Sequence, residues 1–165
     1  MTYDVTIRRK DISALFDLKG NADDIAGWAG AALPPLPGAP NTLTRSGNRS
    51  LLWIGPDHWL LRGALEDEAE LNEALRVEAA PDEISIVLVS DTLAFFDIAG
   101  PDAGNVMAVA TPLDLHASAF PRDGATFTEA FGLKALVLRS SDGFELAVER
   151  SYADMTTDYL GRITA

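Results

Sequence analysis

The stretch ALFDLKG at residues 14–20 decides the fold, because it occurs twice in the chain. It recurs as AFFDIAG at residues 94–100, with Ala, Phe, Asp and Gly in register. A short apolar run that ends in glycine is typical of a strand leaving a sheet. The repeat therefore predicts that this chain is built by duplication of one structural plan.

The residues that follow each copy predict a helix. Asn21 is a candidate N-cap with Asp24 three residues later, and Pro101 occupies a position where a first-turn proline is tolerated. Apolar residues then recur at spacings of three and four, so each helix buries one stripe. The stripes are Ile25, Trp28, Ala29, Ala32 and Leu33 in the first copy, and Val106, Val109, Ala110 and Leu113 in the second.

The next elements repeat as well. Residues 51–63 and 135–148 each predict a strand, a tight turn and a second strand. A helix is expected after each hairpin, over 66–79 and from Ser151 onward. The β-branched run EISIVLVS at 83–90 predicts a central strand.

The first half thus predicts the split βαβ plan, and the second half predicts strand, helix, hairpin and helix with an extra strand at 125–131. We expect an α+β fold of two tandem, duplicated ferredoxin-like βαββ(α) units with mixed or antiparallel sheets. Residues 1–165 are expected to form a single compact domain with internal halves 11–90 and 91–165, because each half alone has a thin core.

Composition narrows the kinds of partner and metal site that the chain could have. Thirteen basic and 25 acidic residues give a formal net charge of −12, which disfavours binding to nucleic acid or to an anionic membrane. The chain has no cysteine and only two histidines, so thiolate and all-histidine metal sites are excluded. No secretory signal or membrane-spanning run is evident, and we expect a cytoplasmic protein.

The residues suggest few candidates for a catalytic or cofactor site. Asp17 and Asp97 occupy equivalent positions, where they either share one cleft and one proton or are separate surface groups. Trp53 and Trp59 either clamp a flat ligand or anchor a core or an interface. No nucleophile, base and orienting group is evident, so we expect no catalytic residue, no metal ligand and no active site of the chain's own.

Four motifs follow one another along the chain: WIGPDHWLL (53–61), DIAGPDA (97–103), TPLDLHASAFP (111–121) and RSYADMTTDYL (150–160). In this order and at this spacing, they resemble the gamma subunit of heterotetrameric sarcosine oxidase. The resemblance extends from about Ser13 to Leu160. It implies the folate-binding fold of aminomethyltransferase, the glycine-cleavage T-protein, and a structural role in a sarcosine-oxidising complex.

The resemblance also implies the partners and cofactors of that complex. Alpha, beta and delta subunits would carry NAD, folate, FAD, FMN and zinc, whereas this chain would hold none of them. The residues expected to form signature or interface contacts are His58, Asp114, His116, Phe120, Arg150 and Tyr152. We expect His58 to be exposed in its turn and His116 to be half-buried.

Two alternatives stay open. One is a complex that acts on dimethylglycine or another N-methyl amino acid in place of sarcosine. The other is a free-standing folate- or pterin-binding protein, which would need a pocket formed by Trp53 or Trp59 with Asp17 or Asp97. As a subunit of a complex, the chain is expected to expose an apolar patch near Trp53, Trp59 and the segment 33–40, through which it would self-associate when isolated.

Overall fold

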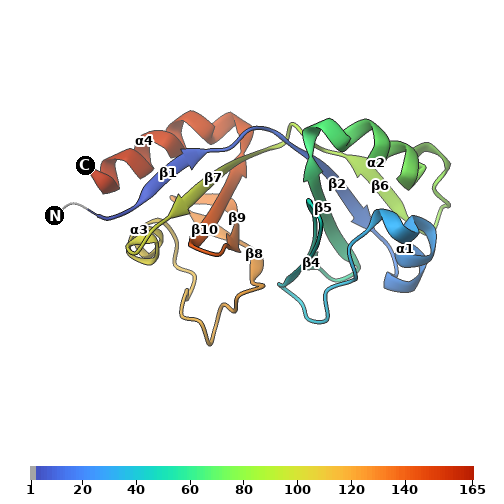
Figure 1. The fold of residues 1–165 in the computed structure, drawn as a ribbon, viewed down its shortest axis with the longest axis horizontal. Helices are drawn as coiled ribbons and strands as arrows, with labels where there is room; N and C mark the ends of the chain where they lie inside the picture. The colour runs from blue at the N-terminus through green and yellow to red at the C-terminus, as the bar shows by residue number, and fades with distance from the viewer. Residues whose placement is uncertain (1–2) are drawn as a thin grey trace. The chain divides into compact units, whose positions relative to one another are not determined.

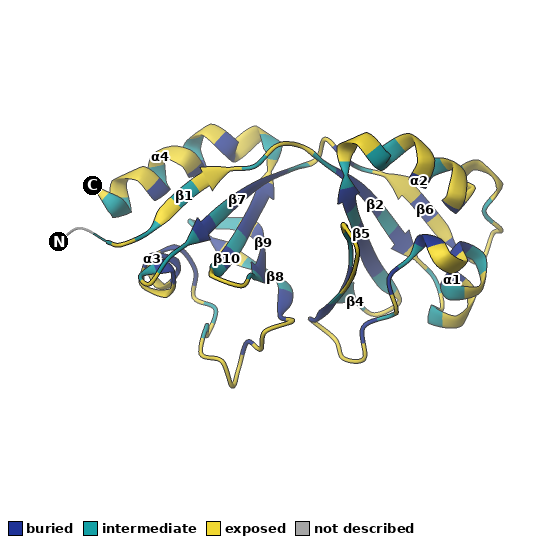
Figure 2. Cartoon of the chain, in the orientation of Figure 1, coloured by how far each residue is buried: buried dark blue, intermediate teal, exposed yellow. Residues whose placement is uncertain are grey.

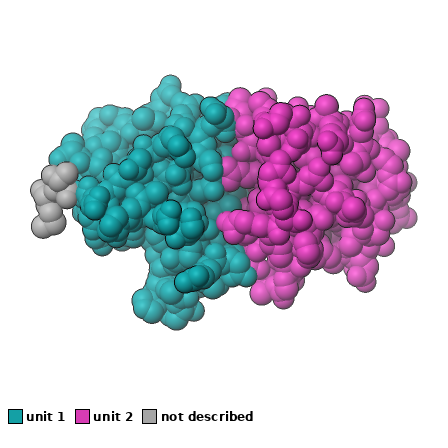
Figure 3. All heavy atoms as spheres, viewed as in Figure 1, with its two compact units in different colours: residues 1–11, 92–165 teal, residues 12–91 magenta. Residues whose placement is uncertain are grey.

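The computed structural model describes residues 3–165, which divide into two compact units (Figure 3). Unit 1 contains the N-terminal residues up to 11 together with residues 92–165, and unit 2 contains residues 12–91. Each unit has an antiparallel five-stranded sheet and two of the four α-helices of the described chain (Figure 1). The predicted α+β class is confirmed.

Unit 2 contains the split βαβ plan with one added strand. Its strands lie in the order β3-β4-β5-β2-β6, and every neighbouring pair is antiparallel. Without β3, this is the strand order of a ferredoxin-like sheet. The elements are β2 (Ser13–Lys19), α1 (Ala22–Ala29), β3 (Leu43–Ser46), β4 (Arg49–Gly55), β5 (His58–Ala64), α2 (Glu68–Leu75) and β6 (Ser85–Leu88).

Unit 1 repeats this arrangement, with the order β1-β7-β10-β9-β8. The neighbouring pairs are again antiparallel. The added strand is β8, which occupies the position of β3. The elements are β1 (Thr6–Arg9), β7 (Leu93–Ala99), α3 (Ala103–Ala110), β8 (Ala125–Ala130), β9 (Leu133–Arg139), β10 (Gly143–Glu149) and α4 (Ala153–Thr164).

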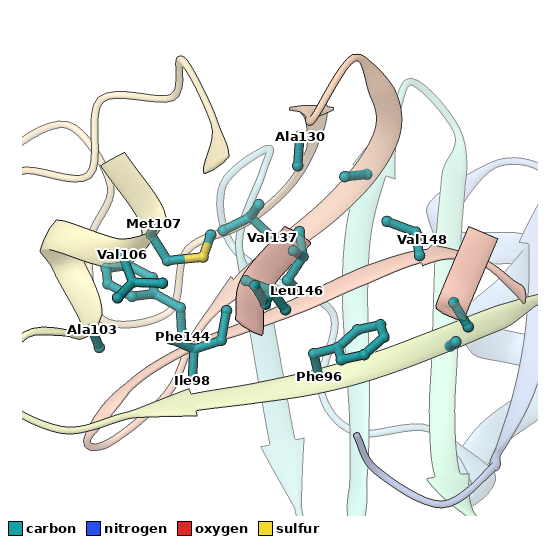
Figure 4. Close-up of a cluster of buried hydrophobic side chains, with 14 of the residues drawn as sticks. Phe96, Ile98, Ala103, Val106, Met107, Ala130, Val137, Phe144, Leu146 and Val148 are labelled. Carbon is teal, nitrogen blue, oxygen red and sulfur yellow. The ribbon is translucent and has the colours of Figure 1, made fainter. Parts of the chain in front are cut away.

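Each unit has a hydrophobic core between one face of its sheet and its helices. In unit 1, Phe96 and Ile98 of β7 pack with Val106 and Met107 of α3 and with apolar residues of β9 and β10 (Figure 4). In unit 2, the corresponding core contains Phe16, Leu18, Ile25, Trp59, Leu61, Leu71 and Leu75. The duplicated motif therefore supplies equivalent core residues to both units.

The helix boundaries follow local chemistry. The Asn21 side chain accepts a hydrogen bond from the Asp23 amide at 2.9 Å, as the sequence predicted for an N-cap. The helix expected over 66–79 is shorter, because α2 ends where Arg76 adopts a left-handed conformation with φ 48°. The Arg76 guanidinium lies 3.7 Å from the centroid of the Trp28 ring, which stabilises this ending.

Within residues 3–165, no helix is long and apolar enough to cross a membrane.

Three strands differ from the sequence prediction. The run 83–90 was predicted to be central, but β6 spans four residues at an edge of its sheet. The density of β-branched residues was therefore a misleading signal for its position. The edge strands β1 and β3 were not predicted, because TIRR and LTRS are polar runs of only four residues.

The edge strand next to β7 comes from the N-terminal end of the chain, whereas the edge strand next to β2 comes from the same half as β2. In chain order, β1 directly precedes β2 but pairs with β7, and β6 directly precedes β7 but pairs with β2. The registers match residue for residue: Arg8 lies opposite Asp97 and Val87 lies opposite Asp17. Unit 2 is thus continuous in sequence, whereas unit 1 is assembled from both ends of the chain.

The pairing of β1 with β7 predicts the effect of deleting residues 1–11. The deletion removes β1 from β7, together with the apolar contacts of Val5 and Ile7 with the core of unit 1. We expect unit 1 to lose about 2 kcal/mol of stability, the scale of one half-buried apolar residue and a few hydrogen bonds. Hydrogen-exchange mass spectrometry should show faster exchange in β7 and unchanged exchange in β2, whose neighbours remain. Equal exchange in β7 before and after the deletion would contradict the pairing of β1 with β7.

Candidate functional site

The two tryptophans of the β4–β5 hairpin stack on each other. Trp53 and Trp59 are cross-strand partners, with ring centroids 6.3 Å apart and planes inclined by 28°. That separation lies in the range of aromatic rings in mutual contact. Trp59 is only 3% exposed and belongs to the core, while the Trp53 indole donates to the Gly55 carbonyl at 2.9 Å. The pair therefore closes the hairpin, and Trp59 contributes nothing to the exposed patch expected there.

Asp17 lies on the opposite face of the sheet from these core residues and bonds to His58. Phe16 and Leu18, which flank Asp17, point into the core, so the alternation of the strand directs the carboxylate to the other face. Its Oδ2 lies 2.8 Å from His58 Nε2, and its Oδ1 lies 3.8 Å from Lys19 Nζ. Contrary to the prediction, His58 is half-buried, with its side chain 29% exposed. This hydrogen bond joins β2 to the start of β5.

Asp97, the repeat equivalent of Asp17, has a different partner. Its Oδ2 lies 3.6 Å from an Arg8 guanidinium nitrogen, and Arg8 lies directly opposite on β1. Lys10 also lies 3.4 Å from Glu145, the partner of Asp97 on β10. Each aspartate is therefore engaged within its own unit. A proton shared by the two carboxylates finds no support in these contacts.

The signature loop, residues 111–124, joins α3 to β8 and protrudes from unit 1 (Figure 1). The Asp114 carboxylate accepts the His116 amide at 2.9 Å, which closes a turn. The imidazole Nδ1 of His116 lies 2.7 Å from the Ser118 hydroxyl. Contrary to the prediction, His116 is exposed rather than half-buried, while Phe120 is 4% exposed and packs into the core.

Arg139, at the end of β9, anchors this loop and was not singled out from the sequence. Its guanidinium donates to the carbonyls of Leu115 at 2.5 Å and Phe120 at 2.9 Å, and lies 4.8 Å from the Phe144 ring centroid. Gly124 completes the anchor, because a Cβ there would lie 2.7 Å from the Phe120 ring. An arginine that ends the apolar run ALVL was the available signal.

Arg150 and Tyr152 lie just after β10, in a short 3₁₀ turn at Arg150–Tyr152. The Arg150 side chain donates to the Leu93 carbonyl at 3.0 Å, and its amide donates to the Thr92 carbonyl at 2.9 Å. Arg150 therefore fixes the start of β7. Tyr152 is 42% exposed and is available for contact with another molecule.

Two shallow depressions of unit 2 lie away from all the predicted site residues. One, of about 470 Å³, is lined by α1 and by the segment before β6, including Asp23, Asp24 and Glu83. The other, of about 250 Å³, lies between the segment after α1 and the β3–β4 turn. Among residues 3–165, no cluster of three or more His, Cys, Asp or Glu side chains is arranged to hold a metal ion.

Solved structures share this fold at low sequence identity. The heterotetrameric sarcosine oxidase from Corynebacterium sp. U-96 in complex with pyrrole 2-carboxylate contains a chain that matches with a TM-score of 0.81 and 22% identity, over 98% of this chain and 86% of that one. The glycine cleavage system aminomethyltransferase T from Bartonella henselae matches with a TM-score of 0.70 and 16% identity, over 96% of this chain and 46% of that one.

A third likeness extends the range of proteins that share this fold. The regulatory subunit of aspartate kinase from Thermus thermophilus, in its ligand-free form, matches with a TM-score of 0.54 and 18% identity, over 96% of this chain and 97% of that one.

No curated protein sequence matches this chain. The sarcosine oxidase gamma subunit family matches residues 21–165, which include the hairpin and the signature loop described above. The chain therefore belongs to the sarcosine oxidase gamma subunit family.

Proposed function

We propose that this chain is a non-catalytic, architectural subunit of a heterotetrameric sarcosine oxidase-type flavoenzyme. Such a complex demethylates sarcosine oxidatively to glycine, forms H₂O₂, and passes the one-carbon unit to tetrahydrofolate or releases it as formaldehyde. Alpha, beta and delta subunits carry FAD, FMN, NAD, zinc and tetrahydrofolate. Family membership supports the place in the complex, and the contacts of the polar residues support the architectural role.

The observation that carries this proposal is that the residues of the signature loop form structural contacts with the loop itself and with the core. Asp114 closes a turn, Phe120 fills the core, and Arg139 binds two carbonyls of the same loop. These contacts give the signature residues structural roles, and they leave the segment His116–Ala119 exposed at the surface. An exposed loop anchored in this way is suited to contact with another subunit.

The pair formed by His58 and Asp17 also fits a structural role better than a catalytic one. His58 and Asp17 form two members of an acid–base arrangement, and a nucleophile at hydrogen-bond distance would be required to complete it. The third group beside this pair is Lys19, which lies opposite His58 on the neighbouring strand and 3.8 Å from the carboxylate. A cation in that position neutralises Asp17 and favours a structural ion pair.

Co-expression tests membership of the complex directly. The affinity-tagged chain should recover the other three subunits in equal amounts from cells that express all four, because an architectural subunit is held by its neighbours. Gel filtration and denaturing electrophoresis measure this. Recovery of the tagged chain alone under low-dilution conditions would refute the proposal.

The exposed histidine of the signature loop provides a second test. His116→Ala should reduce recovery of the other subunits about fivefold, the effect of losing roughly one hydrogen bond at an interface. The melting temperature of the isolated chain should stay unchanged, because His116 is exposed. Ser118→Ala, which keeps the imidazole, is the matched control and should reduce recovery less. A His116→Ala complex that assembles fully but loses turnover would establish a catalytic histidine instead.

A free-standing folate-binding protein is the alternative function, and fluorescence distinguishes it. We expect no saturable change in tryptophan emission up to about 1 mM tetrahydrofolate, which corresponds to a dissociation constant weaker than that concentration. The reason is that Trp53 and Trp59 already contact each other and Trp59 is buried. Trp53→Phe serves as the control for non-specific quenching. A saturable signal that Trp53→Phe abolishes would favour the alternative.

A further inference from the structure

The edge strands β1 and β6 differ sharply in chemistry, although they occupy equivalent positions next to β7 and β2. β1 reads Thr-Ile-Arg-Arg and β6 reads Ser-Ile-Val-Leu. The registers place Arg8 where unit 2 has Val87, and Arg9 where unit 2 has Leu88. One edge therefore carries two cations, whereas the other carries two aliphatic side chains.

Charged side chains on an edge strand prevent other strands from pairing with it. β1 follows this rule, because the side chain of Arg8 is 72% exposed and Arg9 forms an ion pair with Asp154 at 2.9 Å. β6 does not follow it, because Val87 is 49% exposed and Leu88 is 42% exposed (Figure 2). Both side chains belong to the few large apolar residues that the described chain leaves exposed.

The backbone of β6 is also available on its outer side. β6 is the last strand of its sheet, and the Val89 amide donates to the Leu15 carbonyl at 2.8 Å just beyond its end. Hydrogen bonding alternates along an antiparallel strand, so the amide and carbonyl of Leu88 and of Ile86 point away from β2. An extended segment could bond to this edge and cover Val87 and Leu88.

The charges around β6 select the occupant. Asp82 and Glu83 precede the strand, Asp91 follows it, and all three are exposed. Antiparallel pairing of β6 with a second copy would bring the acidic ends of both strands together. A segment of another chain with basic residues flanking an apolar centre meets complementary charge instead.

We propose that β6 accepts an extended strand from another subunit of the complex, with apolar side chains at its centre and basic residues at its ends. This inference rests on the proposed function, because it takes a neighbouring subunit as the source of the strand. It assigns the uncharged edge of unit 2 as an interface, while the charged edge of unit 1 stays free of strand pairing.

The chain itself provides the test variant. The double substitution Val87→Arg and Leu88→Arg converts β6 into Ser-Ile-Arg-Arg, the sequence pattern of β1. The arginine introduced at position 87 would lie opposite Asp17, as Arg8 lies opposite Asp97, so the fold has a precedent for the change. Unaltered thermal unfolding of the isolated chain would show that the variant is folded.

The double variant should reduce recovery of the other subunits from co-expressing cells by at least about tenfold, equivalent to about 1.4 kcal/mol of lost affinity. Leu88→Pro should have the same effect without adding charge, because it removes an outward-pointing amide that the native ladder does not use. Val109→Arg is the matched control: Val109 on α3 is 60% exposed, and this change should leave recovery unaltered.

Each outcome has one meaning. Full recovery with the double variant or with Leu88→Pro overturns the edge proposal, and so does an equal loss with Val109→Arg. If the unaltered chain recovers no subunit at all, the proposed function fails instead. If the unaltered chain forms dimers in sedimentation experiments and the double variant does not, the occupant is a second copy, and the proposal is wrong.

Discussion

The structure depends on the backbone hydrogen bonds of the two central strands, β2 and β7. A strand inside a sheet needs a neighbour on each side, because its amides and carbonyls alternate between the two edges. Here, the outer neighbour of β7 is β1, which comes from the other end of the chain, and the outer neighbour of β2 is β6, which comes from the same half. Unit 2 completes its sheet from residues 12–91 alone, whereas the sheet of unit 1 needs β1 from the other end of the chain.

This constraint explains why the duplicated residues have different surroundings. Asp17 and Asp97 share a motif and a register, but the strand that each one faces has its own sequence. Asp97 meets Arg8, while Asp17 meets Val87 and takes His58 and Lys19 as its polar partners. Duplication set the positions of the aspartates, and the sequences around them then set their partners. The same divergence leaves one edge charged and the other apolar.

The sequence was sufficient for the α+β plan and for the main core. The glycine-terminated motif, the helical spacing of Ile25 and Val106, and the hairpin signals each reflect local physics. The strands that the sequence missed or misplaced depend on non-local pairing: Thr6–Arg9 is too short and polar to be recognised, and the residues 85–88 look central although they lie at an edge. The exposures of His58 and His116 were reversed for a similar reason. His58 bonds to an aspartate 41 positions away, whereas His116 bonds to Ser118 within its own loop.

Our central claim is that the side chains of this protein stabilise its fold and contact other subunits, and that they catalyse no reaction. The most direct measurement is the rate of H₂O₂ formation from sarcosine by the purified chain alone, compared with the rate of the complex reconstituted with it. We predict no turnover by the isolated chain in the presence of FAD, FMN, NAD and tetrahydrofolate, and full turnover once the other subunits are added. Sarcosine-dependent H₂O₂ formation by the isolated chain would contradict the claim.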